Sequence, residues 1–286
     1  MLSQDPVTLI WIVTGILAGV AAMLSAIGFY KFVYFLSVGY GFAIAGIGIA
    51  LIVMSLIGAI PAMGVLEYIL AGLLILYGAR LSGFLLFREI KSASYRKTLG
   101  NVAGKAEKKM PIFVKATIWL CVIVLYVAEA SPIMYRITGG VNYNVTGSVL
   151  DLIFPIVGGA IMLIGLVIET VADLQKSAAK KKNPHRFVDT GLYRFVRCPN
   201  YLGEILFWTG VLVSGGSAMN TWWMWVIAVI GWILIVYVMV SGAKRLEKRQ
   251  TKNYGEDPEY QAYVKKTPIL MHLIPVKSLI NVKWIV

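Results

Sequence analysis

The sequence predicts an all-α integral membrane protein, a bundle of about seven transmembrane helices that forms a single domain over residues 1–286. Hydrophobic residues make up 58% of the chain and charged residues only 14%, which is more apolar than a soluble domain needs for its core. The apolar residues gather into stretches of about 20, the length at which a helix crosses the hydrocarbon core. Basic residues lie between these stretches. The bilayer is therefore the expected solvent of this chain.

The apolar stretches locate the predicted spans. They run near 7–27, 33–60, 64–87, 112–131, 149–172, 200–218 and 221–243. The first is too long for a cleaved signal segment. The second is long and rich in glycine, so its helix is expected to be tilted or to begin with a turn in the interface. The tail after the last span ends in an apolar stretch that is too short to span and is expected at the interface.

The basic residues predict the orientation. The loops 88–115 and 173–199 and the tail from Lys244 hold nearly all of the 27 Lys and Arg residues. With seven spans these segments share one side, which the positive-inside rule assigns to the cytoplasm. The N-terminus is then expected outside and the C-terminus in the cytoplasm, in a bacterial inner membrane or in the endoplasmic reticulum. Nucleic acid is not expected as a partner, because the basic loops lack interleaved aromatic residues.

Cysteine and histidine are too scarce for a metal centre. The chain has two residues of each type, with Cys121 in an apolar stretch and Cys198 in a basic loop. Zinc and haem sites need several such ligands within reach of one another. No metal is therefore expected.

Ionisable groups inside the predicted spans are candidates for function. Each costs roughly 2.5 to 3.5 kcal/mol at the bilayer centre on insertion scales, so each needs a partner or a role. The candidates are Glu67, Arg80, Glu129, Glu169 and Glu204.

Two of these groups belong to short polar patterns. Tyr77 and Arg80 share one face of the third span, where Gly78 would admit the close approach of another body. Arg80 therefore fits either a ligand cavity or a structural ion pair. Glu169 and Asp173 place two negative charges at the negative end of a helix, so they require a partner. Nearby lysines would supply one, as would the hydroxyl or amide groups of a ligand, and both interpretations stay open.

The segment 190–204 has the highest density of polar signals. Asn200 and Glu204 share a helix face at i and i+4, and Gly203 would let a flat ligand approach the backbone. Three arginines precede or lie within the segment: Arg186, Arg194 and Arg197. The set suits a phosphate-bearing cofactor. The alternative is that the arginines anchor to headgroups and that Asn200 and Glu204 form a capping pair.

Three segments resemble the steroid 5α-reductase superfamily, especially its bacterial-type branch. They are Glu169-Thr-Val-Ala-Asp173-Leu-Gln175, the stretch from Gly191-Leu-Tyr-Arg to Pro199-Asn-Tyr-Leu-Gly-Glu204, and Tyr260-Gln-Ala-Tyr263-Val-Lys-Lys-Thr-Pro268. Residues 1–60 have no such motif, which leaves 64–286 as the expected region for cofactor and substrate. The resemblance implies about seven helices that hold NADPH in a cytoplasm-facing cavity, with a steroid entering from the lipid.

The resemblance also implies roles for single residues. Asn200 and Glu204 look like the pair that fixes the nicotinamide amide, and Tyr77 looks like the tyrosine that donates to the substrate carbonyl. The expected cofactor contacts are Arg80, Glu169, Asp173, Lys176, Arg186, Tyr193, Arg197, Asn200, Glu204 and Arg245. The glutamate that partners the family tyrosine is missing from the second span, so Glu67 or Glu129 is expected to replace it, and Glu67 is taken as the catalytic partner. Cys198 stands where many relatives have histidine.

These implied roles predict a reductase that transfers a hydride from NADPH to the activated C=C bond of a 3-oxo-Δ4-steroid-like lipid. The addition leaves negative charge on the carbonyl oxygen, which a positioned phenol can stabilise and protonate. The expected partners are the bilayer and a steroid-like lipid, and the chain is expected to be a monomer.

Two other functions compete with the reductase. One is an S-adenosylmethionine-dependent membrane methyltransferase of the isoprenylcysteine carboxyl type, which shares the Arg-x-Pro-x-Tyr-x-Gly pattern. The other is a transporter or structural bundle in which Arg80 and Glu129 form a buried pair.

Overall fold

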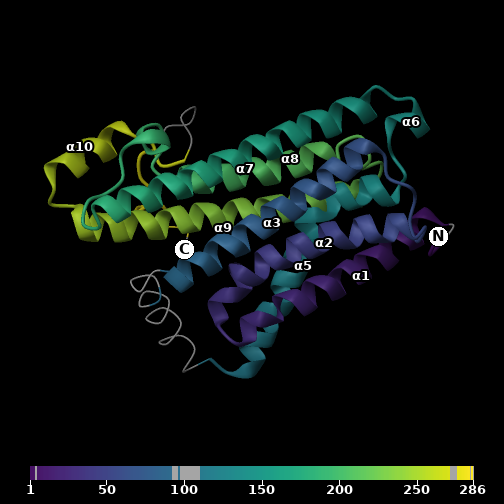
Figure 1. Ribbon diagram of the computed structural model, residues 1–286, viewed down its shortest axis with the longest axis horizontal. Coiled ribbons are helices and arrows are strands. Elements are labelled where there is room, and N and C mark those ends of the chain that lie inside the picture. Colours follow the sequence, from purple (N-terminus) through teal and green to yellow (C-terminus); the bar gives the residue numbers. More distant parts are fainter. Residues whose placement is uncertain (4, 92–95, 97–109, 271–275, 284, 286) are drawn as a thin grey trace. The chain divides into compact units, whose positions relative to one another are not determined.

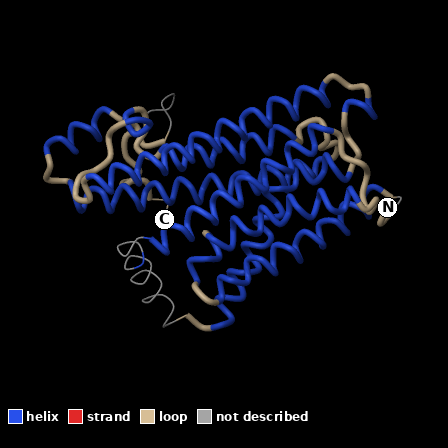
Figure 2. Tube along the Cα trace, in the orientation of Figure 1, coloured by secondary structure: helices blue, strands red, loops and turns tan. Residues whose placement is uncertain are grey.

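The computed structural model describes residues 1–3, 5–91, 96, 110–270, 276–283 and 285. These residues form helices and loops, and none of them lies in a strand (Figures 1 and 2). Six helices of the described chain are long and apolar enough to cross a membrane: Pro6–Phe29, Val38–Leu56, Val65–Lys91, Ile112–Thr138, Leu150–Lys182 and Trp222–Tyr254. The all-α membrane class predicted from the sequence is therefore confirmed. Most of the basic loop 88–115 lies outside the described residues.

The predicted span at 200–218 forms a shorter helix than expected. Its helix, α8, covers Pro199–Ser214 and has 16 residues. At 1.5 Å per residue its length is about 24 Å, less than the roughly 30 Å of a hydrocarbon core. The structure thus shows six long apolar helices and one short one among the described residues. A count of seven spans and the orientation of the termini stay predictions.

Local sequence explains where several elements begin and end. In chain order the elements are α1 (Pro6–Ser25), η1 (Ala26–Phe29), η2 (Phe32–Leu36), α2 (Val38–Leu56), α3 (Val65–Lys91), α5 (Ile112–Thr138), α6 (Tyr143–Thr146), α7 (Leu150–Lys182), η3 (Gly191–Arg194), α8 (Pro199–Ser214), α9 (Trp222–Tyr254) and α10 (Pro258–Lys266). The Asp5 carboxylate caps α1 by accepting from the Thr8 N–H at 2.7 Å. The predicted second span begins with a 3₁₀ turn, η2, before α2 starts. Both α7 and α9 continue beyond their apolar stretches into basic sequence.

The chain divides into two compact units. The first comprises Met1–Gly159 and Val211–Gly231, and the second comprises Ala160–Gly210 and Trp232–Val286. Helices α7, α8 and α9 contribute residues to both units.

In the first unit, α2 and α3 are in contact at their glycines. A Cβ atom on Gly78 would lie only 2.2 Å from the Gly41 carbonyl oxygen. Next to this contact the Ser82 hydroxyl donates to the Val38 carbonyl at 2.7 Å. Small residues allow such close backbone packing in membranes. Gly78 therefore admits the close approach of another body, and that body is helix α2.

A buried ion cluster joins α3, α5 and α7 in the first unit. The Arg136 side chain is 0% exposed, and its guanidinium lies 3.8 Å from a carboxylate oxygen of Glu67 and 3.8 Å from one of Asp151. Its Nε donates to the Ser214 carbonyl at 2.8 Å. The sequence did not point to Arg136, because the apolar stretch of the fourth span ends near 131. Helix α5 continues past that point to Thr138 and thereby brings the arginine inside.

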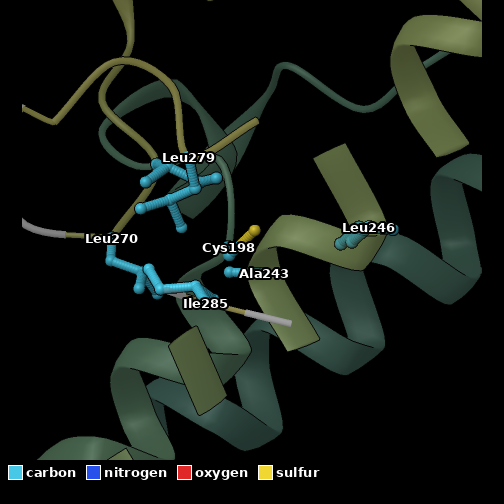
Figure 3. Packing of buried hydrophobic residues seen from close by; sticks show 7 residues of the cluster. Cys198, Ala243, Leu246, Leu270, Leu279 and Ile285 are labelled. Carbon is cyan, nitrogen blue, oxygen red and sulfur yellow. The ribbon is translucent and has the colours of Figure 1, made fainter. Parts of the chain in front are cut away.

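In the second unit, the C-terminal tail is part of the hydrophobic core. Figure 3 shows the cluster, which contains Cys198, Ala243, Leu246, Ile269, Leu270, Leu279 and Ile285. The backbone N–H groups of Arg197 and Cys198 donate to the carbonyls of Pro268 and Ile269, each at 2.9 Å. Of the described residues at the apolar end of the tail, Leu279 and Ile285 are buried in this core, whereas Val276 is 40% exposed. A position of this end at the membrane interface stays a prediction.

Candidate functional site

Three predicted cofactor contacts come together in the second unit, where α7 and α8 cross. A Cβ atom on Gly203 would lie 2.7 Å from the Glu169 nitrogen and 2.7 Å from the Gly165 carbonyl oxygen, so the two backbones touch. Glu169 and Glu204 are 3% and 6% exposed. Asn200 lies one turn before Glu204 on the same face of α8. Gly203 thus serves the helix contact that joins these side chains, and not a ligand as the sequence suggested.

The Asn200 side chain has an unused acceptor. Its Oδ1 atom is buried and accepts no hydrogen bond from any described residue. Leaving a buried polar atom unsatisfied costs about 1–3 kcal/mol, so such an atom calls for a donor. A primary carboxamide supplies N–H donors and a carbonyl acceptor, which complements both an asparagine amide and a neighbouring carboxylate. The nicotinamide group therefore fits the chemistry of this cluster.

Polar side chains continue along α7 from this cluster. Asp173 and Lys176 follow Glu169 at spacings of four and seven residues, which places all three on one helix face. Both Asp173 and Lys176 are half-buried. On α9, Arg245 is exposed.

Arg186 stands on the surface of the second unit. Its guanidinium donates to the Asp189 carboxylate at 2.9 Å and to the Glu259 carboxylate at 2.5 Å. The hydrogen bond with Glu259 raises the pKa of Arg186, so this arginine stays charged. Because its side chain is exposed, Arg186 can bind an anion from solvent in addition to its two carboxylate partners.

Arg197 and Tyr193, two of the expected cofactor contacts, are buried and make contacts within the protein. Arg197 is 2% exposed and donates to the Glu247 carboxylate at 2.9 Å and to the Lys277 carbonyl. Tyr193 donates to the Ala172 carbonyl at 3.3 Å, and burial raises the pKa of its phenol. Arg197 therefore ties the tail to α9, and Tyr193 ties the loop to α7.

The tyrosine-rich tail motif holds the same loop. The Tyr263 ring stacks on Phe187 with 5.5 Å between centroids, and its hydroxyl donates to the Tyr193 carbonyl at 2.7 Å. Tyr260 meets Phe187 edge to face at 5.2 Å. A shallow pocket of about 250 Å³ opens beside this motif, lined by Thr251, Gly255, Tyr260, Gln261, Val264 and Lys265. None of the predicted site residues lines it.

Tyr77 lies in the first unit and is linked to an acidic group other than the expected one. Its hydroxyl donates to the Tyr40 hydroxyl at 3.2 Å, and Tyr40 donates to Glu129 Oε2 at 3.1 Å. Glu67 lies ten positions earlier on α3, about 15 Å away along the axis, and meets Arg136. Pairing Glu67 with Tyr77 is therefore wrong, and Glu129 is the candidate that the structure connects to it.

Tyr40 was not among the site residues predicted from the sequence. Its only signal was a hydroxyl-bearing ring beside a glycine in an apolar span. Arg80 is half-buried, and its guanidinium lies 5.5 Å from the centroid of the Phe84 ring. Glu129 accepts a hydrogen bond from Tyr40 at 3.1 Å, and an Arg80–Glu129 pair stays a prediction.

Cys198 is expected to react slowly with alkylating reagents. It is 1% exposed, and burial raises the pKa of its thiol to about 12. At pH 8 the nucleophilic thiolate is therefore scarce. In a Cys121→Ser background we expect maleimide labelling to be at least roughly tenfold slower in the folded protein than after denaturation. Equal labelling rates in the two states would show that the thiol is accessible.

The sequence model of one protein family matches residues 39–267 of this chain. The family is described as "Protein of unknown function (DUF1295)". The matched region includes Tyr40 in the first unit and the Asn200 cluster in the second. No curated protein and no solved structure matches the chain.

Proposed function

The chain belongs to this family of proteins of unknown function, which is related to the steroid 5α-reductases, and on that premise we propose that it is a membrane-embedded, NADPH-dependent reductase. Its proposed substrate is a steroid-like lipid in which a C=C bond is conjugated to a carbonyl. The observation that best supports the proposal is the buried, unused acceptor of Asn200 beside Glu169 and Glu204. The proposed topology has seven spans with the basic segments in the cytoplasm.

The second unit would hold the cofactor. Asn200 can accept from the carboxamide N–H₂ group and donate to its carbonyl, while Glu204 accepts the second N–H. The exposed guanidinium of Arg186 and the ammonium of Lys176 suit phosphate oxygens. NADPH, when bound, would supply a hydride to the substrate. Binding of the carboxamide would orient the nicotinamide ring relative to the substrate, and such orientation is what a protein contributes to cofactor chemistry.

The first unit would supply the acid. Hydride addition to a conjugated enone leaves negative charge on the carbonyl oxygen, and a phenol at that oxygen both stabilises the charge and donates a proton. Tyr77 is a buried phenol that is hydrogen-bonded, through the Tyr40 hydroxyl, to the Glu129 carboxylate. A substrate carbonyl that accepts from Tyr77 would therefore be activated for reduction.

Thermal unfolding with and without ligand tests the proposal. A ligand that binds only the folded protein stabilises it by about 2.7 kcal/mol at a concentration of 100 times Kd. We expect NADPH to raise the Tm of the intact detergent-purified protein, and Asn200→Ala and Glu204→Gln to remove most of that increase. Asn183→Ala, at an exposed position of the same unit, is the matched control and should keep it.

Other ligands distinguish the competing functions in the same experiment. Stabilisation by S-adenosylmethionine alone would favour a methyltransferase. A chain that responds to NADPH, NADH and S-adenosylmethionine in no measurable way would not be a reductase.

A further inference from the structure

Three buried side chains of the first unit form a continuous hydrogen-bonded chain. Tyr77 on α3, Tyr40 on α2 and Glu129 on α5 are joined by oxygen–oxygen distances of 3.2 and 3.1 Å. All three side chains are at least 96% buried. The hydrogen bonds thus connect a phenol to a carboxyl group through buried side chains of the first unit.

The packing of the first unit holds the two phenols in place. Tyr40 and Tyr77 directly precede Gly41 and Gly78, the glycines at which α2 and α3 touch. Their rings meet edge to face with 6.1 Å between centroids. On its other side the Tyr40 ring lies 5.0 Å from the ring of Tyr126. The two phenols therefore lie directly beside the backbone contact between α2 and α3.

Tyr126 belongs to the same aromatic cluster but not to the chain. Its hydroxyl donates to the Phe35 backbone carbonyl, so it does not take part in the hydrogen bonds among Tyr77, Tyr40 and Glu129. It is therefore an internal reference, a buried phenol in van der Waals range of Tyr40 with a different hydrogen-bond partner.

The hydrogen bonds among Tyr77, Tyr40 and Glu129 allow protons to move in either direction. A phenol both donates and accepts, so two hydroxyl rotations reverse the order of donors along the series. The Glu129 carboxyl group, at the end of this series, can hold one proton. With the order reversed, Glu129 donates to Tyr40, Tyr40 donates to Tyr77, and the Tyr77 hydroxyl can donate to an acceptor placed next to it.

We propose that Glu129 and Tyr40 are the proton relay that supplies Tyr77 in the reduction; this inference rests on the proposed function. The β-carbon of the enone gains the hydride with its two electrons, and the C=C π pair moves to the carbonyl oxygen. That oxygen takes the Tyr77 proton, Tyr77 takes the Tyr40 proton, and Tyr40 takes the Glu129 proton. The resulting enol shifts one proton to the α-carbon, so the substrate gains one hydride and one proton. A proton from solvent restores the Glu129 carboxyl group after the product leaves.

Steady-state kinetics of the intact protein with NADPH and progesterone, a 3-oxo-Δ4 steroid, test the relay. Positioned acid catalysis contributes about 10²–10⁴-fold, so interrupting the supply of the proton is expected to lower kcat by about 10- to 100-fold. Tyr40→Phe and Glu129→Gln should each show this loss with KM changed less than about twofold, because neither residue is proposed to contact the substrate. Tyr126→Phe should keep kcat within about twofold.

The pH profile separates a relay from a purely structural role. In Glu129→Gln the proton must come from solvent, so kcat should fall as pH rises from 6 to 9, by about tenfold more than in the wild type. Glu129→Asp should restore part of kcat and the wild-type profile. Thermal unfolding of each variant verifies its fold, and if Glu129→Gln does not fold, Tyr40→Phe and Glu129→Asp decide the question.

The outcomes are distinct. Wild-type reduction with unchanged kcat and pH profile in Tyr40→Phe and Glu129→Gln would overturn the relay and leave the proposed function intact. Binding of NADPH without reduction of the enone would overturn both. Loss of kcat in the two relay variants with retention in Tyr126→Phe would support the relay.

Discussion

Replacing Arg136 by methionine is expected to lower the free energy of unfolding by about 3–5 kcal/mol, because removal of one partner from a buried ion cluster leaves uncompensated charge in the interior. Glu67 and Asp151 would keep their burial but lose the guanidinium that lies 3.8 Å from each. The Ser214 carbonyl would also lose its donor. Chemical denaturation of the intact protein in detergent measures this change.

Two further variants show whether charge is the cause. Arg194→Met, at an exposed position, should change the free energy of unfolding by less than about 0.5 kcal/mol. Adding Glu67→Gln and Asp151→Asn to Arg136→Met should recover part of the loss, since the cluster is then neutral throughout. A small effect of Arg136→Met, similar to that of Arg194→Met, would mean that the cluster contributes little to stability.

Gly78→Ala is expected to destabilise the first unit by about 3 kcal/mol, because overpacking a tight contact forces the backbone to move. The new Cβ atom would lie 2.2 Å from the Gly41 carbonyl oxygen and 2.6 Å from the Ala45 nitrogen. Neither backbone atom can move aside without separating α2 from α3. Because Tyr40 and Tyr77 flank the same contact, reductase activity should fall along with the Tm.

The same helix offers matched controls for Gly78. Gly72 and Gly83 also lie in α3, and a Cβ atom on either would meet nothing within 4 Å. Alanine is the better helix former by about 1 kcal/mol, so Gly72→Ala and Gly83→Ala should be neutral or slightly stabilising. If all three variants behaved alike, the effect at Gly78 would reflect helix propensity and not the contact with α2.

Several parts of the candidate site were predictable because they depend on one helix alone. Asn200 and Glu204 share a face at four residues' separation, and Glu169, Asp173 and Lys176 share another, whatever packs against them. The periodicity of an α-helix relates residues up to about two turns apart. Those pairings therefore needed no knowledge of the neighbouring helices.

The partners of Tyr77, Gly203 and Arg136 were not predictable in this way. Tyr77 has two acidic candidates, Glu67 on its own helix and Glu129 on another, and only the packing of α2 between α3 and α5 makes Glu129 the connected one. A glycine in a span fits both a ligand approach and a helix contact, and Gly203 makes the helix contact.

That the chain forms a bundle of apolar helices follows from its amino-acid pattern, because in lipid every backbone polar group must be satisfied within its own segment and helices about 20 residues long achieve this. Which polar side chains meet depends instead on how these helices pack. Arg136 lies in a buried cluster because α5 continues beyond its apolar stretch, and four apolar residues of the C-terminal tail, Ile269, Leu270, Leu279 and Ile285, are buried because they pack on the apolar surface of the second unit. Contacts between helices depend on the register and depth at which they pack, and that information is spread over residues far apart in the chain.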